Sequence, residues 1–203
     1  MDKDLLNWAV QNSQSSFEKT AIDQEKLSFF QNALGPSDAV KMKEFIHFAL
    51  GEDNPVDEKL TALDNLEMLV ESIDNANDLE SLGCWDNILK LLENSELVVS
   101  TLWIIGTAAQ NNSRVKDLLI EKYKVLIKIT EFLSSSNASV VQKSLYATSS
   151  LLCGNKHGIR KFKDLGGVEL LVSLSKKDIF SNRVNFIFEN VINIDDQINQ
   201  SNQ

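Results

Sequence analysis

Residues 97–110 have the sequence Leu-Val-Val-Ser-Thr-Leu-Trp-Ile-Ile-Gly-Thr-Ala-Ala-Gln, and this stretch decides the fold class. Its apolar residues recur at the spacing of one helix face, namely Val98, Leu102, Ile105 and Ala109. Three further residues share the opposite face: Trp103, Thr107 and Gln110. This separation predicts an amphipathic helix that buries one side and leaves the other free.

Three other stretches carry apolar residues at the same spacing: Asp57–Ile73, Val140–Leu152 and Arg183–Ile192. The four stretches also share a five-residue pattern, which is apolar, mostly apolar, polar or glycine, small polar, and apolar. The fourth position of this pattern falls at residues 65, 107, 150 and 190, so the spacings are 42, 43 and 40 residues. Helical periods of about 40 to 47 residues are typical of armadillo or HEAT units.

The segments between the long stretches fit a short helix followed by a middle helix. The expected pairs are Asp78–Ser81 with Trp85–Leu92, Val115–Ile120 with Val125–Leu133, and Ile159–Phe162 with Gly167–Leu174. The glycine pair Gly166-Gly167 lets the backbone turn sharply between two helices. We therefore predict an all-α fold, a right-handed armadillo-like α-solenoid over residues 36–193 with about three repeats plus a leading helix. An irregular helical bundle is the alternative.

Composition argues against several function classes. The chain has 203 residues, of which 43% are hydrophobic, and its formal net charge is −9. An acidic protein is a poor partner for nucleic acid or for an anionic membrane surface, and no apolar run reaches the roughly 18 residues that a membrane span needs. It contains only two histidines and no phosphate-binding or metal-binding motif, so we expect no enzyme activity, no cofactor and no metal.

The polar faces of the long third helices are the candidate binding surface, because these helices line the hollow side of an armadillo array. A column of residues on these faces is expected to form the groove: Asn65, Trp103, Thr107, Tyr146, Ser150, Arg183 and Asn190, with Asp64 and Gln110 beside them. Trp103 is either a contact anchor for a partner or a cover for a neighbouring repeat. The acidic row Asp64, Glu67 and Glu71 is interpreted as a solvated face.

Two internal segments and the start of the chain resemble a known family. The stretch Leu63–Leu79 contains Asp74-Asn75-Ala76, and residues 105–111 are Ile-Gly-Thr-Ala-Ala-Gln-Asn. Both resemble the armadillo-type nucleotide exchange factors of the seventy-kilodalton heat-shock chaperones (Hsp70). The start, Leu5-Leu6-Asn7-Trp8 followed by Asn12-Ser13, resembles the fungal cytosolic members.

The resemblance implies a cytoplasmic, monomeric co-chaperone that clamps the nucleotide-binding domain of Hsp70 and promotes ADP release. Asp74, Asn75 and Ala76 match the family's loop after its first long helix, and Arg183 matches a basic residue that contributes to chaperone contact in relatives. Residues 1–12 would contact the chaperone through Leu5, Leu6 and Trp8, whose alternative role is an ordinary short helix packed on the array. Residues 13–35 would be a flexible or weakly helical linker, and residues 194–203 a disordered polar tail.

A general armadillo protein-binding scaffold without exchange activity is the alternative function. Nuclear import adaptors of that class repeat Trp-x-x-x-Asn on successive third helices to hold basic peptides. Here the corresponding positions begin with Thr61, Trp103, Tyr146 and Phe186, so that ladder is absent. The sequence therefore favours an exchange factor over a general scaffold.

Overall fold

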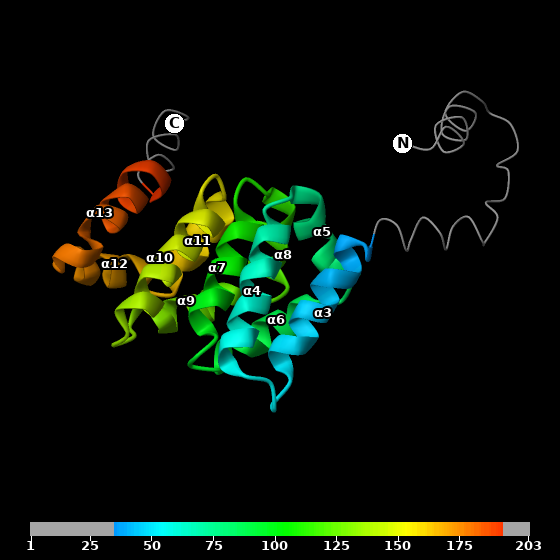
Figure 1. The fold of residues 1–203 in the computed structure, drawn as a ribbon. Coiled ribbons are helices and arrows are strands. Elements are labelled where there is room, and N and C mark those ends of the chain that lie inside the picture. Colours follow the sequence, from blue (N-terminus) through cyan, green and yellow to red (C-terminus); the bar gives the residue numbers. More distant parts are fainter. Residues whose placement is uncertain (1–34, 193–203) are drawn as a thin grey trace, which may run out of the picture. The chain divides into compact units, whose positions relative to one another are not determined.

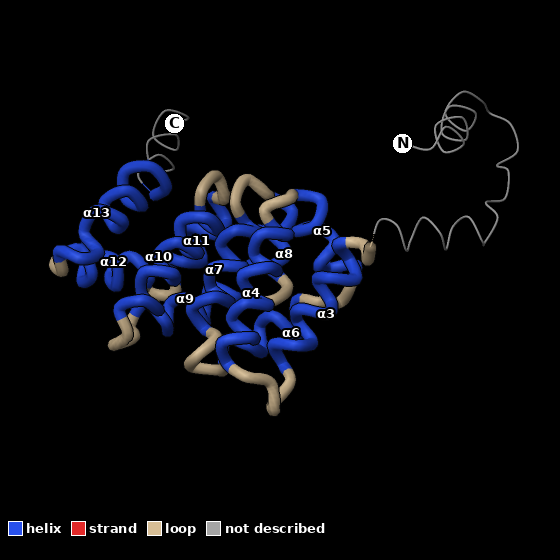
Figure 2. The backbone as a smooth tube through the Cα atoms, viewed as in Figure 1, coloured by secondary structure: helices blue, strands red, loops and turns tan. Residues whose placement is uncertain are grey.

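The computed structural model describes residues 35–192, and every regular element in this range is helical (Figure 2). The elements are α3 (Asp38–Leu50), α4 (Val56–Val70), α5 (Ile73–Ser81), α6 (Trp85–Lys90), a 3₁₀ turn (Leu91–Glu93), α7 (Val98–Ala109), α8 (Ser113–Glu121), α9 (Val125–Leu133), α10 (Ala138–Leu152), α11 (Lys156–Asp164), α12 (Gly167–Ser175), α13 (Asp178–Ile187) and a π-helical turn (Phe188–Ile192). Among these described helices, none is long and apolar enough to cross a bilayer.

The helices form three successive triplets, α5–α6–α7, α8–α9–α10 and α11–α12–α13, preceded by the pair α3 and α4. The third helices contact one another in chain order, α4 with α7, α7 with α10, and α10 with α13. Figure 1 shows α4, α7 and α10 side by side, with α13 beyond them. The predicted all-α, armadillo-like stack is confirmed.

Several helix boundaries differ from the sequence prediction, most clearly at the junction of α4 with α5 and at the start of α13. The stretch predicted as one helix from Asp57 to Ile73 ends at Val70, because Ser72 adopts an extended conformation and its carbonyl accepts the amide of Ala76, which starts α5. The last long helix begins at Asp178, five residues before the predicted start, and its last turn widens into a π-helix from Phe188. Phe180 is buried, so the first turn of α13 already belongs to the core.

Among the long helices, α7 has the largest buried fraction, with nine of its twelve residues buried. This helix lies between two other third helices, so it is covered from both sides. A unit of this kind cannot bury its own apolar face, and its stability therefore depends on its neighbours. The central position of α7 explains why its sequence is the most apolar of the long helices.

Asparagine caps tie successive repeats together. The Asn112 side chain caps α8 by accepting the amide of Val115 at 3.2 Å, while its Nδ2 donates to Asn77 of α5. One repeat later, the Asn155 side chain accepts the amide of Gly158 at 2.8 Å, and its Nδ2 donates to Asp117 of α8 at 2.9 Å. Each amide thus satisfies an otherwise unpaired helix N-terminus and also links two repeats.

Gly106 allows α10 to approach α7 closely. A Cβ at this position would lie 2.4 Å from Cε1 of Tyr146 and 3.3 Å from the Cα of Ala147. Any larger residue would therefore push the Tyr146 ring away from α7. The glycine of the Ile-Gly-Thr segment is required by packing between repeats, despite the cost of glycine in a helix.

We predict that Gly106→Ala lowers the free energy of unfolding by about 1–3 kcal/mol, because the added methyl overpacks the contact with Tyr146. Urea unfolding followed by circular dichroism measures the change. In a Tyr146→Ala background the same substitution should cost much less, since the ring is absent and alanine favours the helix. Equal costs in the two backgrounds would show that the ring is not the constraint.

Candidate functional site

The candidate site is the side of the third helices that carries polar and aromatic side chains, here called the third-helix face. Its members come from four helices and one helix end: Asp64 and Glu67 on α4; Trp103 and Thr107 on α7, with Gln110 directly after that helix; Lys143, Tyr146, Ser149 and Ser150 on α10; and Arg183 and Phe186 on α13. Because the third helices stack in order, residues about 40 positions apart in the sequence become neighbours on this face.

A hydrogen-bonded network crosses three of these helices. The Thr107 hydroxyl donates to Oε1 of Glu67 at 2.6 Å, and the Tyr146 hydroxyl lies 3.2 Å from the same Thr107 oxygen. Tyr146 also lies 3.5 Å from Oε1 of Gln110. Thr107 and Glu67 are each only 7% exposed, so the network is a buried polar link between α4, α7 and α10.

Two cations stack on the aromatic rings of this face. Nζ of Lys143 lies 3.4 Å from the centroid of the Trp103 ring and 5.8 Å from that of Tyr146. The Arg183 guanidinium lies 5.6 Å from the Tyr146 centroid and 5.3 Å from that of Phe186. Cation–π contacts within about 6 Å are favourable, so a continuous band of aromatic rings and cations joins α7, α10 and α13.

Partial burial lowers the pKa of Lys143 below its ordinary value, because desolvation disfavours the ammonium. The carboxylates of Glu67 and Asp64 act in the opposite direction and favour the charged form. Lys143 is thus a cation with reduced hydration, set among aromatic rings and facing the acidic end of the same surface.

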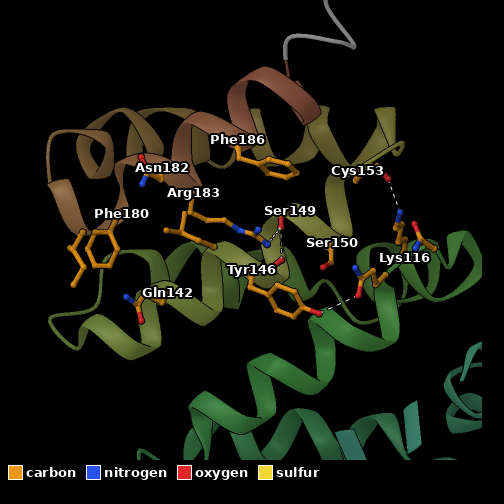
Figure 3. Close-up of a pocket in the computed structure, with 14 residues that line it drawn as sticks. Lys116, Gln142, Tyr146, Ser149, Ser150, Cys153, Phe180, Asn182, Arg183 and Phe186 are labelled. Atoms are coloured by element: carbon orange, nitrogen blue, oxygen red, sulfur yellow. Dashed lines mark hydrogen bonds between the residues drawn. The ribbon is translucent and has the colours of Figure 1, made fainter. Parts of the chain in front are cut away.

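A pocket of about 490 Å³ opens between α10 and α13. In Figure 3 the Arg183 side chain crosses the pocket toward Ser149 and Tyr146, and its Nη2 donates to the Ser149 hydroxyl at 2.7 Å. Ser150 and Phe186 also line this space. The pocket therefore combines a fixed guanidinium with apolar walls.

The structure brings together most of the predicted column. Trp103, Thr107, Gln110, Tyr146 and Arg183 are joined by the contacts above, and Ser150 lines the pocket. Two other predicted residues bond within their own helices instead. Asn65 donates to the Thr61 carbonyl and Asn190 to the Phe186 carbonyl, and both side chains are exposed.

The prediction that Asp74, Asn75 and Ala76 lie in a loop is wrong, because these residues form the first turn of α5. Ala76 is 1% exposed and belongs to the core, so it offers no surface to a partner. Asn75 donates to the Leu69 carbonyl at the end of α4 and to Oδ2 of Asp38. Asp74 remains exposed.

The prediction that the acidic row on α4 is a solvated face is wrong for one of its three residues. Asp64 and Glu71 are exposed as expected, but Glu67 is buried and its Oε1 accepts the Thr107 hydroxyl. The spacing of the row could not reveal this, because the partner lies 40 residues away on α7.

Four members of the face were not among the predicted site residues: Glu67, Lys143, Ser149 and Phe186. Lys143 lies three residues before Tyr146, so helical spacing places both on one face. Its contact with Trp103 and the bond between Ser149 and Arg183 join different helices. No local pattern indicates those contacts. Leu5, Leu6 and Trp8 lie outside the described residues.

Comparison with known families shows to which family the chain belongs. Residues 75–201 match the family described as "SIL1/FES1/HPBP1 C-terminal domain", and residues 3–79 match that described as "Nucleotide exchange factor Fes1". The chain belongs to the SIL1/FES1/HPBP1 family. The predicted resemblance to exchange factors of Hsp70 is confirmed.

Curated relatives carry the name "Hsp70 nucleotide exchange factor FES1". The protein from Candida glabrata is 38% identical, over 82% of this chain and 60% of the relative. That from Eremothecium gossypii is 33% identical, over 87% of this chain and 63% of the relative. That from Saccharomyces cerevisiae is 34% identical, over 82% and 61%. The chain thus spans about three fifths of the length of these relatives.

Solved structures support the fold. A designed armadillo repeat protein, solved in complex with the peptide (KR)4, superposes with a TM-score of 0.62 at 20% identity, over 70% of this chain and 60% of that one. An engineered protein superposes with a TM-score of 0.64 at 16% identity, over 70% and 59%. At these identities the likeness concerns the armadillo architecture alone.

We predict that Thr107→Val lowers the free energy of unfolding by about 1–3 kcal/mol, because the buried carboxylate of Glu67 loses its hydroxyl donor. Thr61→Val is the matched control. Thr61 is exposed on α4 and its hydroxyl donates only to the Asp57 carbonyl of its own helix, so its loss should cost less than about 0.5 kcal/mol. Chemical denaturation compares the two variants, and similar losses would contradict a structural role for the network.

Proposed function

We propose that this chain is a nucleotide exchange factor that binds the nucleotide-binding domain of an Hsp70 chaperone and promotes the release of ADP. The observation that carries this proposal is the family membership, since both family matches and the named relatives concern such factors. The third-helix face supports it, because it offers an aromatic and cationic surface that extends over three helices.

The proposed activity requires a difference in binding affinity and no catalytic group. The factor must bind the nucleotide-free, opened domain more tightly than the closed, ADP-bound one. Thermodynamic reciprocity then requires that ADP weakens binding of the factor by the same ratio. We therefore propose that the chain is not an enzyme and that it acts by stabilising one conformation of its partner.

Arg183 is proposed as a central contact with the chaperone. It is partly exposed, and its side chain is held in place by Ser149, Tyr146 and Phe186. A guanidinium oriented in this way loses little entropy on binding. Arginine and tyrosine are also enriched among the residues that dominate interface energies.

The cytosol is the proposed compartment, by analogy with the fungal cytosolic members that the start of the chain resembles. The general scaffold is the weaker alternative. The cations on α10 and α13 suit a basic peptide poorly, whereas such a peptide is the ligand in the designed armadillo structure.

We predict that the purified chain accelerates dissociation of fluorescently labelled ADP from a cytosolic Hsp70 by about 5-fold or more, the lower end of ordinary allosteric coupling. Stopped-flow mixing with excess unlabelled ATP measures the rate. Denatured chain serves as the control. An unchanged rate at saturating chain would refute the exchange activity, and tight binding without acceleration would favour the scaffold.

We further predict that Arg183→Glu weakens binding to Hsp70 about tenfold or more, because it reverses the charge of a side chain in the pocket. The matched control is Arg160→Glu, an equal charge reversal at an exposed residue on α11, the first helix of the third triplet. Titration calorimetry measures affinity, and circular dichroism measures helicity. Equal effects of the two reversals would indicate a general charge effect and no specific contact.

A further inference from the structure

Lys143 stands out on the third-helix face because its charge is partly buried without an acceptor. Its ammonium covers the Trp103 ring at 3.4 Å, and Trp103 itself is 37% exposed. Over residues 35–192, Lys143 makes no hydrogen bond and no ion pair, although it is the only basic residue of α10. Asp64 and Glu67 influence it only through space.

An ammonium in this position has unused donor capacity. Lysine carries three N–H donors, and removing a charge from water is costly unless an acceptor replaces the lost hydration. The rings of Trp103 and Tyr146 compensate only in part, since a cation–π contact directs no acceptor at the N–H groups. The N–H groups of Lys143 therefore remain available to an acceptor from another molecule.

The charge of the described chain is divided along the solenoid. Residues 38–113 contain fifteen Asp or Glu and four Lys or Arg, whereas residues 114–192 contain thirteen Lys or Arg and seven Asp or Glu. On the third-helix face this division places Asp64 and Glu67 on α4 at one end, and Lys143 and Arg183 at the other. A partner that lies along this face in one orientation must present negative charge to α10 and α13.

We propose that Lys143 is a further partner-binding residue that, together with Arg183, receives an acidic side chain of the partner on the third-helix face. The Nζ of Lys143 and the guanidinium of Arg183 lie 5.8 and 5.6 Å from the centroid of the Tyr146 ring. A carboxylate is small and can accept several N–H donors at once. The inference rests on the proposed function, because it names the chemical group on the Hsp70 domain that this face recognises.

Arg183 retains donors for such a carboxylate. A guanidinium has five N–H groups, and one Nη2 bond to Ser149 is the hydrogen bond that Arg183 makes among the described residues. The bond fixes one side of the fork, so the remaining N–H groups are directed from a defined position. Lys143, whose Nζ lies over the Trp103 ring of α7, supplies a second donor group.

The test compares the affinity of variants of this chain for the nucleotide-free Hsp70 nucleotide-binding domain, by titration calorimetry at low and at high salt. Lys143→Met keeps the apolar stem over Trp103 and removes the charge, so it should weaken binding about tenfold and reduce the salt dependence. Lys143→Arg keeps the charge and should bind within about threefold of the unmodified chain. Lys128→Met, at an exposed residue of α9 whose partner is Glu131, is the matched control and should bind normally.

The acceptor is identified by charge exchange. Lys143→Glu should bind poorly, and one Asp→Lys or Glu→Lys variant of the Hsp70 domain should restore its affinity. The inference is overturned if Lys143→Met binds like the unmodified chain, or if Lys143→Arg loses as much affinity as Lys143→Met while the urea midpoint is unchanged. Failure of the unmodified chain to bind Hsp70 at all would instead refute the proposed function, and this inference with it.

Discussion

The close contact between α7 and α10 is the constraint on which the rest of the structure depends. Tyr146 can lie against α7 only because Gly106 has no side chain. From that position its hydroxyl reaches Thr107, and its ring lies near both Lys143 and Arg183. Packing between two repeats thus determines where the polar and cationic groups of the surface are placed.

Buried contacts and exposed side chains occupy neighbouring positions of the same helices. Thr107 and Glu67 are buried and join α4 to α7, while Trp103 on α7 and Gln110 directly after it remain exposed. The first helices of the second and third triplets, α8 and α11, join the repeats separately, through asparagine caps that link each repeat to the one before it. A rigid array of this kind presents its surface with little entropy loss on binding.

The distribution of charge makes the third-helix face asymmetric along the array. The acidic groups on α4 and the cations on α10 and α13 make the two ends of the third-helix face different. Such an arrangement favours one orientation of a partner and disfavours the reverse. For the proposed exchange activity this matters, since stabilising one conformation of the partner requires contact with a defined part of it.

The sequence by itself determined the helical repeat, its period and the family, because apolar spacing and short local segments carry that information. It also placed Trp103, Thr107 and Tyr146 on one face. Only the tertiary structure showed that Ala76 is in the core, that Glu67 is buried and that Lys143 covers Trp103. The last two features arise from contacts between residues 40 positions apart, and helical periodicity specifies the face of a helix but not the neighbour that meets it.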